Sequence, residues 1–489
     1  MLEGSIREKY TVVIGLEVHA QLQTESKIFC SDPNAFGAEP NTHISPISLG
    51  HPGTLPKLNK KAVEFAIQMG LACDCEITRH NVFARKNYFY PDLPKGYQIT
   101  QDKAPICVGG KVWIKRTEAS DYHSIPLNRI HMEEDAGKSM HLEGRTETAV
   151  DYNRAGVPLI EIVTEPAIHS AEDAGLFLAE IRKMVRYLEV CDGNMEQGSL
   201  RCDANVSVKL KEASELGKKV EVKNMNSIKN VQKAIEFEVE RQIIALEKGE
   251  EIVSETRDFD ADSGTTSGMR TKEELNDYRY FPDPDLCPLI VEEEWIEQLR
   301  ANMPQLPKAL IEKFTNEYGL PLYDAQILTE TKEMAAYFEV VCKHTEDYKL
   351  VSNWLMGPVK SYLNEHSLTV KDLILKPEQL AKLVSLVSDN KISSSVASQQ
   401  IFPLLLKAED ADPEKIAYEQ NLIQDSSSDS IQPIIDEVLK DMADKVKAYH
   451  KGKKGLIGMF MGEVMKRSKG KVDPKLANKL LVETLDNNK

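Results

Sequence analysis

No run of apolar residues in this chain approaches the roughly 18 that are needed to span a bilayer as a helix. The N-terminal segment Met1–Tyr10 also lacks the apolar core of a secretory signal, and it carries acids that a mitochondrial presequence avoids. We therefore expect a cytoplasmic protein that makes no membrane contact.

Several catalytic signatures are missing as well. The chain has no Walker A loop, no Rossmann glycine fingerprint and no Gly-x-Ser-x-Gly elbow. Its eight cysteines are scattered, and none has the sequence context of a protease or amidase nucleophile. Only Cys73 and Cys75 lie close together, without the two-residue spacer of common zinc sites, so we expect reduced thiols. The groups that remain are carboxylates, imidazoles and cations, which favour metal-assisted phosphoryl transfer over covalent acyl transfer.

A net charge of −16 over 489 residues argues against general affinity for nucleic acids, DNA included. The charge is unevenly distributed, because residues 451–480 contain nine Lys or Arg and only two acids. A basic end on an acidic body is typical of a protein that contacts RNA through one module. A solvated helical surface rich in lysine explains the same pattern equally well.

Periodicity divides the chain into a sheet region and a helical region. Residues 199–210 alternate strictly between polar and apolar or small side chains, which predicts a strand with one open face carrying Arg201, Asp203 and Asn205. Helices that back the sheet are expected after the capping residues Ser170 and Ser227. Beyond residue 292 the period is 3.6 throughout. We predict an α+β fold with a sheet domain (1–294), a helical domain (295–410) and a small helical tail domain (411–489).

The run from Tyr10 to Ala20 predicts a strand that places Glu17 and His19 on one face. A carboxylate and an imidazole so placed can bind one divalent cation, and the stretch His131–Ser139 offers further oxygen ligands and another imidazole. The alternative is a polar edge strand together with a solvated acidic turn, and spacing alone does not exclude it.

Taken in order, the motifs resemble one known family, the B subunit of aspartyl/glutamyl-tRNA amidotransferase. The segments that carry the resemblance cover nearly the whole chain: Gly15–His19, Arg85–Asp92, His131–Ser139, Leu159–Val163, Gly198–Asn205, Asp277–Pro282, Asn353–Gly357 and Gly455–Leu480. The resemblance implies a β-rich cradle, a helical domain and a tail that contacts tRNA.

It also implies a reaction and partners. ATP and Mg²⁺ would serve to phosphorylate the side-chain carboxylate of a misacylated Glu-tRNA(Gln) or Asp-tRNA(Asn), and ammonia would then displace phosphate. The ammonia would come from glutamine hydrolysed in a separate amidase subunit, which a small third subunit clamps to this chain in a heterotrimer. The alternative is a non-catalytic scaffold that binds tRNA. Sequence does not decide between the two tRNA substrates, and it does not locate the adenine pocket.

By the same resemblance, Glu17, His19 and Glu134 would hold Mg²⁺. Strand alternation places Glu133 with His131 and Glu134 with Met132, so spacing leaves open which glutamate binds the metal. The position in the family favours Glu134.

Four more residues receive roles only through the resemblance. Lys86 and Lys95 match positions near the end of the ammonia passage and the transamidation site. Arg201 and Asp203 match residues that would line the cofactor site.

The sequence departs from the family at one place. Many members carry an N-terminal zinc knuckle built from two cysteine pairs, whereas here only Cys30 is present and the second pair is replaced by Ser45 and Ser48. One thiolate does not make a structural zinc site. We therefore predict no zinc and a loop held by local packing.

Overall fold

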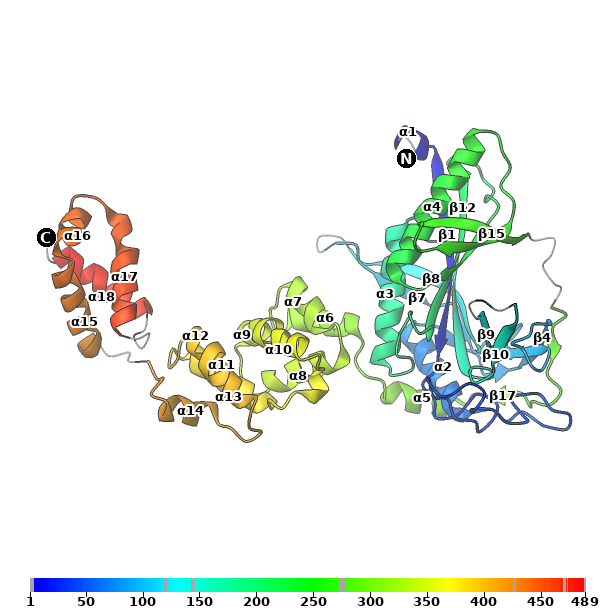
Figure 1. Cartoon of the computed structure of the whole chain (residues 1–489), viewed down its shortest axis with the longest axis horizontal. Helices are drawn as coiled ribbons and strands as arrows, with labels where there is room; N and C mark the ends of the chain where they lie inside the picture. The colour runs from blue at the N-terminus through cyan, green and yellow to red at the C-terminus, as the bar shows by residue number, and fades with distance from the viewer. Residues whose placement is uncertain are drawn as a thin grey trace. The chain divides into compact units, whose positions relative to one another are not determined.

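The computed structural model describes residues 4–117, 121–141, 144, 146–271, 278–424, 428–468, 472 and 474–487. The chain forms two compact units, Met1–Pro307 and Lys308–Lys489 (Figure 1). A large mixed sheet lies in the first unit and helices make up the second, which confirms the α+β class. The predicted boundary at residue 410 stays a prediction.

The first unit is built on a 13-stranded sheet whose main path runs β15-β14-β13-β12-β1-β11-β8-β5-β4-β16. The strands of this unit are β1 (Tyr10–Gln21), β2 (Glu76–Ile77), β3 (His80–Asn81), β4 (Ala84–Asn87), β5 (Tyr97–Thr100), β6 (Cys107–Val108), β7 (Lys111–Ile114), β8 (His123–Glu134), β9 (Lys138–His141), β10 (Thr148–Asp151), β11 (Pro158–Thr164), β12 (Leu200–Leu210), β13 (Val220–Met225), β14 (Glu255–Asp260), β15 (Thr265–Thr271), β16 (Phe281–Pro282) and β17 (Leu289–Ile290). Its helices are α1 (Gly4–Arg7), α2 (Lys60–Ala72), α3 (Ala171–Tyr187), α4 (Ile228–Glu247) and α5 (Glu293–Ala301).

Strand β1 lies in the middle of this sheet, between β11 and β12, and it pairs antiparallel with both. The alternative of a polar edge strand is therefore wrong. Because side chains alternate across a strand, the register also fixes which residues share a face. His19 is paired with Glu161 on one side and with Arg201 on the other, and Glu17 is paired with Val163 and Asp203.

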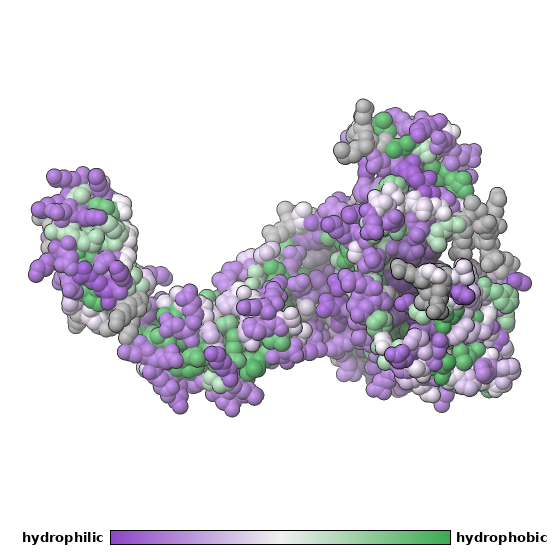
Figure 2. Space-filling model, viewed as in Figure 1, coloured by the Kyte–Doolittle hydropathy of each residue, from purple (hydrophilic) through white to green (hydrophobic). Residues whose placement is uncertain are grey.

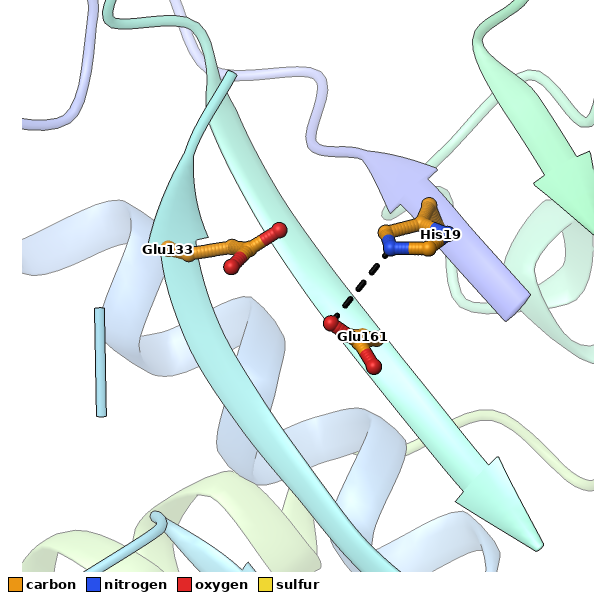
Figure 3. A group of neighbouring side chains, drawn as sticks. All are labelled: His19, Glu133 and Glu161. Carbon is orange, nitrogen blue, oxygen red and sulfur yellow. Dashed lines mark ion pairs between the residues drawn. The ribbon is translucent and has the colours of Figure 1, made fainter. Parts of the chain in front are cut away.

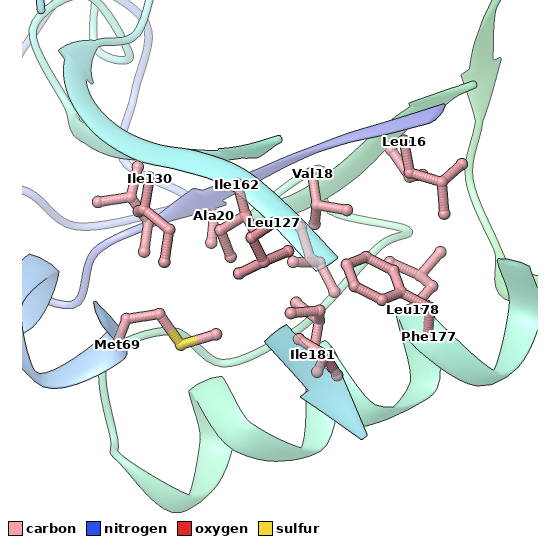
Figure 4. Packing of buried hydrophobic residues seen from close by; sticks show 14 of the residues in the cluster. Leu16, Val18, Ala20, Met69, Leu127, Ile130, Ile162, Phe177, Leu178 and Ile181 are labelled. Atoms are coloured by element: carbon pink, nitrogen blue, oxygen red, sulfur yellow. The ribbon is translucent and has the colours of Figure 1, made fainter. Parts of the chain in front are cut away.

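The opposite face of β1 is the core. Leu16, Val18 and Ala20 are fully buried, and Figure 4 shows them above the apolar side chains of α3, with Met69 of α2 nearby. Helices α3 and α4 begin as predicted, because the Ser170 and Ser227 hydroxyls each accept a backbone N–H at 3.1 Å. The helices thus cover one face of the central sheet and leave the other for polar side chains.

The second unit is helical throughout its described residues. Its helices are α6 (Pro307–Asn316, which begins at the unit boundary), α7 (Leu322–Leu328), α8 (Lys332–Cys342), α9 (Tyr348–Trp354), α10 (Lys360–Glu365), α11 (Pro377–Ser388), α12 (Ser394–Val396), α13 (Phe402–Leu405), α14 (Pro413–Glu419), α15 (Ser428–Asp441), α16 (Ala443–His450), α17 (Ile457–Arg467) and α18 (Pro474–Asn487). Helices α15 to α18 enclose an apolar core of their own, and hydrophilic residues cover most of their face in Figure 2. Within the described residues no helix combines the length and apolar character of a membrane span.

Replacing Phe177 tests the packing of α3 against the sheet. The ring is fully buried, so Phe177→Ala should lower the free energy of unfolding by about 3–5 kcal/mol. Phe36→Ala removes a ring that is 77% exposed, and it should change the free energy of unfolding by less than about 0.5 kcal/mol. Denaturant unfolding of the two variants measures the difference, and equal effects would contradict this account of the core.

Candidate active site

The face of the sheet that the helices leave uncovered carries the polar residues predicted from the alternation in β12. Arg201, Asp203 and Asn205 are half-buried on this face, and the residues between them in the sequence are buried in the core. The register places them opposite His19, Glu17 and the glycine at position 15. The predicted open face is therefore confirmed.

Three adjacent strands bring His19 (β1), Glu133 (β8) and Glu161 (β11) together on this face (Figure 3). One possible ligand atom from each residue lies within 4.8 Å of the others. The His19 Nε2 is 3.4 Å from a Glu161 oxygen, and the His131 Nε2 approaches the same oxygen at 3.3 Å. We call His19, Glu133 and Glu161 the histidine–glutamate cluster.

Electrostatics keep the two carboxylates of this cluster ionised. Burial acts to raise the pKa of Glu161, but hydrogen bonds from His131 and His19 outweigh it and hold that pKa well below its usual value. Burial also opposes ionisation of Glu133, and here His131 and the charge of Lys86 lower the pKa on balance. Burial lowers the pKa of His19, whereas the hydrogen bond and charge of Glu161 raise it on balance.

The donor set fits one divalent cation. Two carboxylate oxygens and one imidazole nitrogen at mutual contact distance form a donor set for one ion, and His131, whose pKa these carboxylates raise to about 9, and Lys86 place positive charge beside the carboxylates. Carboxylate oxygens suit Mg²⁺, and the imidazole also makes the site suitable for Mn²⁺. Glu133 keeps a further contact, since the Thr100 hydroxyl donates to its Oε2 at 3.2 Å.

Glu17 belongs to a different group, together with Asp203 and Glu221, which we call the acidic cluster. This cluster already contains a cation, because the Lys223 ammonium pairs with Asp203 and lies 3.1 Å from a Glu221 oxygen. Glu17 itself accepts a hydrogen bond from the Asn205 amide at 2.8 Å. Glu17 and His19 are two positions apart on β1, which corresponds to about 7 Å along the strand. Their side chains therefore lie on the same face of the sheet but in different clusters.

Glu134 faces away from the histidine–glutamate cluster. Its Oε1 pairs with the Lys95 ammonium and accepts the Ile99 backbone N–H at 2.9 Å. The structure therefore does not bring Glu17, His19 and Glu134 together at one point, because β8 alternates and only Glu133 lies on the same face as His131. Lys95 is turned away from the cluster with Glu134.

Lys86 and Arg201 lie near the cluster with different partners. Burial acts to lower the pKa of Lys86, but the charge of Glu133 outweighs it and raises that pKa on balance, which keeps a cation beside the cluster. Its Nζ is 4.9 Å from the centre of the Tyr278 ring. Arg201 is engaged by the buried Asp135, with nitrogen–oxygen distances of 2.9 and 3.2 Å.

Sequence reasoning named Glu133 only as a neighbour and left Glu161 out of the site. A signal existed for Glu161, because it is an acid in the otherwise apolar run Leu159–Val163 of a central strand. A lone carboxylate at a buried strand position needs a polar partner. Which partner it has depends on strand register, which the sequence does not reveal.

The loop that resembles a zinc knuckle is organised around a buried lysine. Lys27 is fully buried, and its Nζ donates to the His43 carbonyl at 2.7 Å and lies 3.9 Å from Asp32. The Ser48 hydroxyl donates to Asp32 at 2.6 Å. Burial raises the pKa of Cys30 to about 11, which makes its thiol a poor metal ligand. A polar network, in addition to packing, holds this loop.

Comparison with models of known families identifies the class of the protein as that of GatB-type catalytic subunits. Residues 12–297 match the model of the GatB/GatE catalytic domain, and residues 336–485 match the GatB domain. All residues of both clusters and Lys86 fall within the first match.

Relatives over the full length identify the family more closely. The B subunit of aspartyl/glutamyl-tRNA(Asn/Gln) amidotransferase from Salinibacter ruber is 49% identical over 98% of this chain and 97% of its own length. The proteins of the same name from Geotalea uraniireducens and Thermodesulfovibrio yellowstonii are also 49% identical, over 98% of this chain and 100% and 99% of theirs. The chain belongs to this family of amidotransferase B subunits, which confirms the resemblance seen in the sequence.

The buried pair of Asp135 and Arg201 predicts a pH-dependent contribution to stability. Burial opposes ionisation of Asp135, but Arg201 and Arg154 lower its pKa from 3.8 to about 2. The stabilisation is therefore present above pH 3.8 and is lost as the pH falls through about 2, and it amounts to about 2 kcal/mol. At pH 7, Asp135→Asn should lower the free energy of unfolding by at least that amount.

Urea unfolding across a pH series measures the difference in free energy of unfolding between wild type and Asp135→Asn. This difference should begin to shrink below about pH 4. Asp262→Asn, at an exposed carboxylate, serves as the control. A difference that stays constant down to the lowest pH would contradict the assignment.

Proposed function

We propose that this chain catalyses the ATP- and Mg²⁺-dependent activation of the side-chain carboxylate of misacylated Glu-tRNA(Gln), Asp-tRNA(Asn) or both, followed by amidation. The observation that carries the proposal is the histidine–glutamate cluster, in which two ionised carboxylates and one imidazole converge on the open face of the sheet. Family membership supports the amidotransferase reaction.

The chemistry explains why ATP is needed. A carboxylate is a weak electrophile, so one of its oxygens first attacks the γ-phosphorus of ATP, the bond to the bridging oxygen breaks and ADP leaves. Ammonia then attacks the carbon of the resulting acyl phosphate, phosphate leaves with the bonding electron pair, and a proton is lost from nitrogen. The product is the side-chain amide.

In this proposal, the residues of this chain bind the metal ion and the phosphate groups and neutralise the charge of the phosphates. His19, Glu133 and Glu161 would hold Mg²⁺, which when bound neutralises charge on the phosphate oxygens. Lys86 supplies a second positive charge beside Glu133 and can bind the acyl phosphate. Glu17 and Asp203 lie along the same face with Lys223, and Arg201 is positioned by Asp135.

The roles that we propose for the partner subunits follow from catalytic motifs that this sequence lacks. Ammonia must be generated elsewhere, because the chain carries no signature of an amidase nucleophile. We therefore propose an amidase subunit and a small third subunit as partners in a heterotrimer that acts in the cytoplasm. The relatives are named as B subunits, which supports a complex of several chains.

Replacing Glu133 and Glu134 separately with glutamine tests whether the histidine–glutamate cluster is the metal site. In the assembled enzyme, Glu133→Gln should reduce tRNA-dependent ATP hydrolysis and the affinity for Mn²⁺ by at least about 100-fold, the upper end of what changes around a metal site cause. The rate of glutamine hydrolysis should remain, because that reaction belongs to the partner.

Glu134→Gln is the matched comparison, since it keeps size and shape but weakens a pair with Lys95 outside the cluster. It should leave Mn²⁺ affinity within a few-fold of wild type. The opposite ranking of the two variants would assign the metal to Glu134 and overturn the cluster.

Removing the tail tests the proposed tRNA contact. The core of α15 to α18 begins at Ile431, so a deletion of residues 428–489 removes a whole packing unit, whereas a cut at Lys440 would expose its interior. Loss of the exposed lysines 451, 453 and 454 should weaken tRNA binding and reduce its salt dependence. Filter binding over a salt series measures both, with Mn²⁺ affinity as the control. Undiminished tRNA binding would exclude a tRNA-binding role for the tail.

A further inference from the structure

Lys86, the cation beside the histidine–glutamate cluster, differs from the other lysines near the site. Lys95 pairs directly with Glu134, and Lys223 pairs directly with Asp203. Among the residues that the structure describes, no carboxylate oxygen lies within ion-pair distance of the Lys86 Nζ. Within this part of the chain, the ammonium group of Lys86 is therefore free to receive an anion that enters the site.

Aromatic rings take the place of a direct acidic partner. The Lys86 Nζ lies 4.9 Å from the centre of the Tyr278 ring and 5.9 Å from the centre of the Tyr88 ring, and these two rings meet edge to face at 6.0 Å. The face of an aromatic ring attracts a cation within about 6 Å and does not neutralise its charge. Burial acts to lower the pKa of Lys86, but Glu133 and neighbouring tyrosines raise it on balance, so the group stays charged.

Tyr278 comes from a part of the sequence far from β4, and the backbone around it is fastened to that strand. The backbone N–H and the side-chain amide of Asn87 donate to the Tyr278 carbonyl at 3.0 and 3.2 Å, and the same amide donates to the Arg279 carbonyl at 2.8 Å. Further along, Arg85 forms a 2.8 Å ion pair with the buried Asp283. None of these contacts uses the Tyr278 side chain, so its ring can be replaced without releasing the segment.

Arg85, the neighbour of Lys86 on β4, shows the more common arrangement. Its guanidinium lies 4.3 Å from the centre of the Tyr97 ring, but it also pairs with Asp283 and Asp285 at 2.8 and 2.9 Å. The two neighbours point to opposite faces of the strand. One strand thus carries a cation that acids neutralise and a cation that rings hold.

We propose that Tyr278 is a positioning residue for amidation, whose ring holds the Lys86 ammonium beside the histidine–glutamate cluster as a cation that can bind the acyl phosphate. A carboxylate could position the lysine as well, but it would neutralise the charge that the phosphate needs. The proposal rests on the proposed function for the role of Lys86, and it adds the group that positions this lysine.

The position of Lys86 can be measured in the assembled enzyme without the reaction. Reductive ¹³C-methylation places methyl groups on the Nζ, and the ring current of Tyr278 should shift their NMR signal upfield from those of exposed lysines. The signal is identified by its absence in Lys86→Arg. Tyr278→Leu should move it into the range of exposed lysines, whereas Tyr278→Phe keeps the aromatic face and should leave it in place. An unmoved signal in Tyr278→Leu would overturn the proposal.

The rate of amidation, measured with ammonium chloride in place of glutamine, shows whether this position matters. Tyr278→Leu should lower kcat about tenfold, whereas Tyr278→Phe should keep it within about twofold of wild type. The KM for the aminoacyl-tRNA and the affinity for Mn²⁺ should not change in either variant. The control Tyr90→Leu removes a ring that is 60% exposed in the loop after β4, and it should leave kcat unchanged.

A double-mutant cycle separates an effect that acts through Lys86 from a structural effect. In a Lys86→Met background, Tyr278→Leu should cause no further loss of kcat. A further loss of about tenfold in that background, equal losses in Tyr278→Phe and Tyr278→Leu, or full kcat in Lys86→Met would overturn the proposal. These outcomes are distinct from a failure of the proposed function, which would appear as tRNA-dependent ATP hydrolysis that persists in Glu133→Gln.

Discussion

The site depends on the pairing of Glu161 with two histidines inside a sheet. A carboxylate on a central strand is costly to bury, and His19 and His131 from the flanking strands supply the compensating hydrogen bonds. The same oxygen faces both rings, so the arrangement fixes three strands relative to one another at this point. The other polar side chains of the open face, from Lys86 in β4 to Lys223 in β13, are positioned by the pairing of their own strands within the same sheet.

The charged side chains of this face form separate groups that differ in their balance of acidic and basic residues. The acidic cluster sets three carboxylates against the one ammonium of Lys223, whereas Asp135 pairs with the guanidinium of Arg201. The two carboxylates of the histidine–glutamate cluster face His19, His131 and Lys86, whose pKa values these carboxylates raise against the effect of burial. Sheet geometry separates the groups by the length of two residues, about 7 Å, so one extended substrate can contact several of them at once.

Local signals in the sequence were sufficient to predict the helices and strands. They were insufficient to predict which side chains meet across neighbouring strands. The alternation in β12, the caps at Ser170 and Ser227 and the change of period after residue 292 predicted the α+β fold, because each is a property of neighbouring residues. The grouping of Glu17 with Asp203 and of His19 with Glu161 was not predictable, because it depends on which strands pair and in what register. For the same reason the family position pointed to Glu134 while the fold turns that side chain toward Lys95.

The three residues of the histidine–glutamate cluster lie far apart in the chain, at positions 19, 133 and 161, and each comes from a different strand. During synthesis the first of them leaves the ribosome more than a hundred residues before the last, so the cluster is incomplete until β11 has emerged and docked. Binding of the proposed ion would therefore be a late step of maturation that follows sheet assembly. Once bound, the ion would favour the assembled sheet by mass action, since the unfolded chain lacks the site.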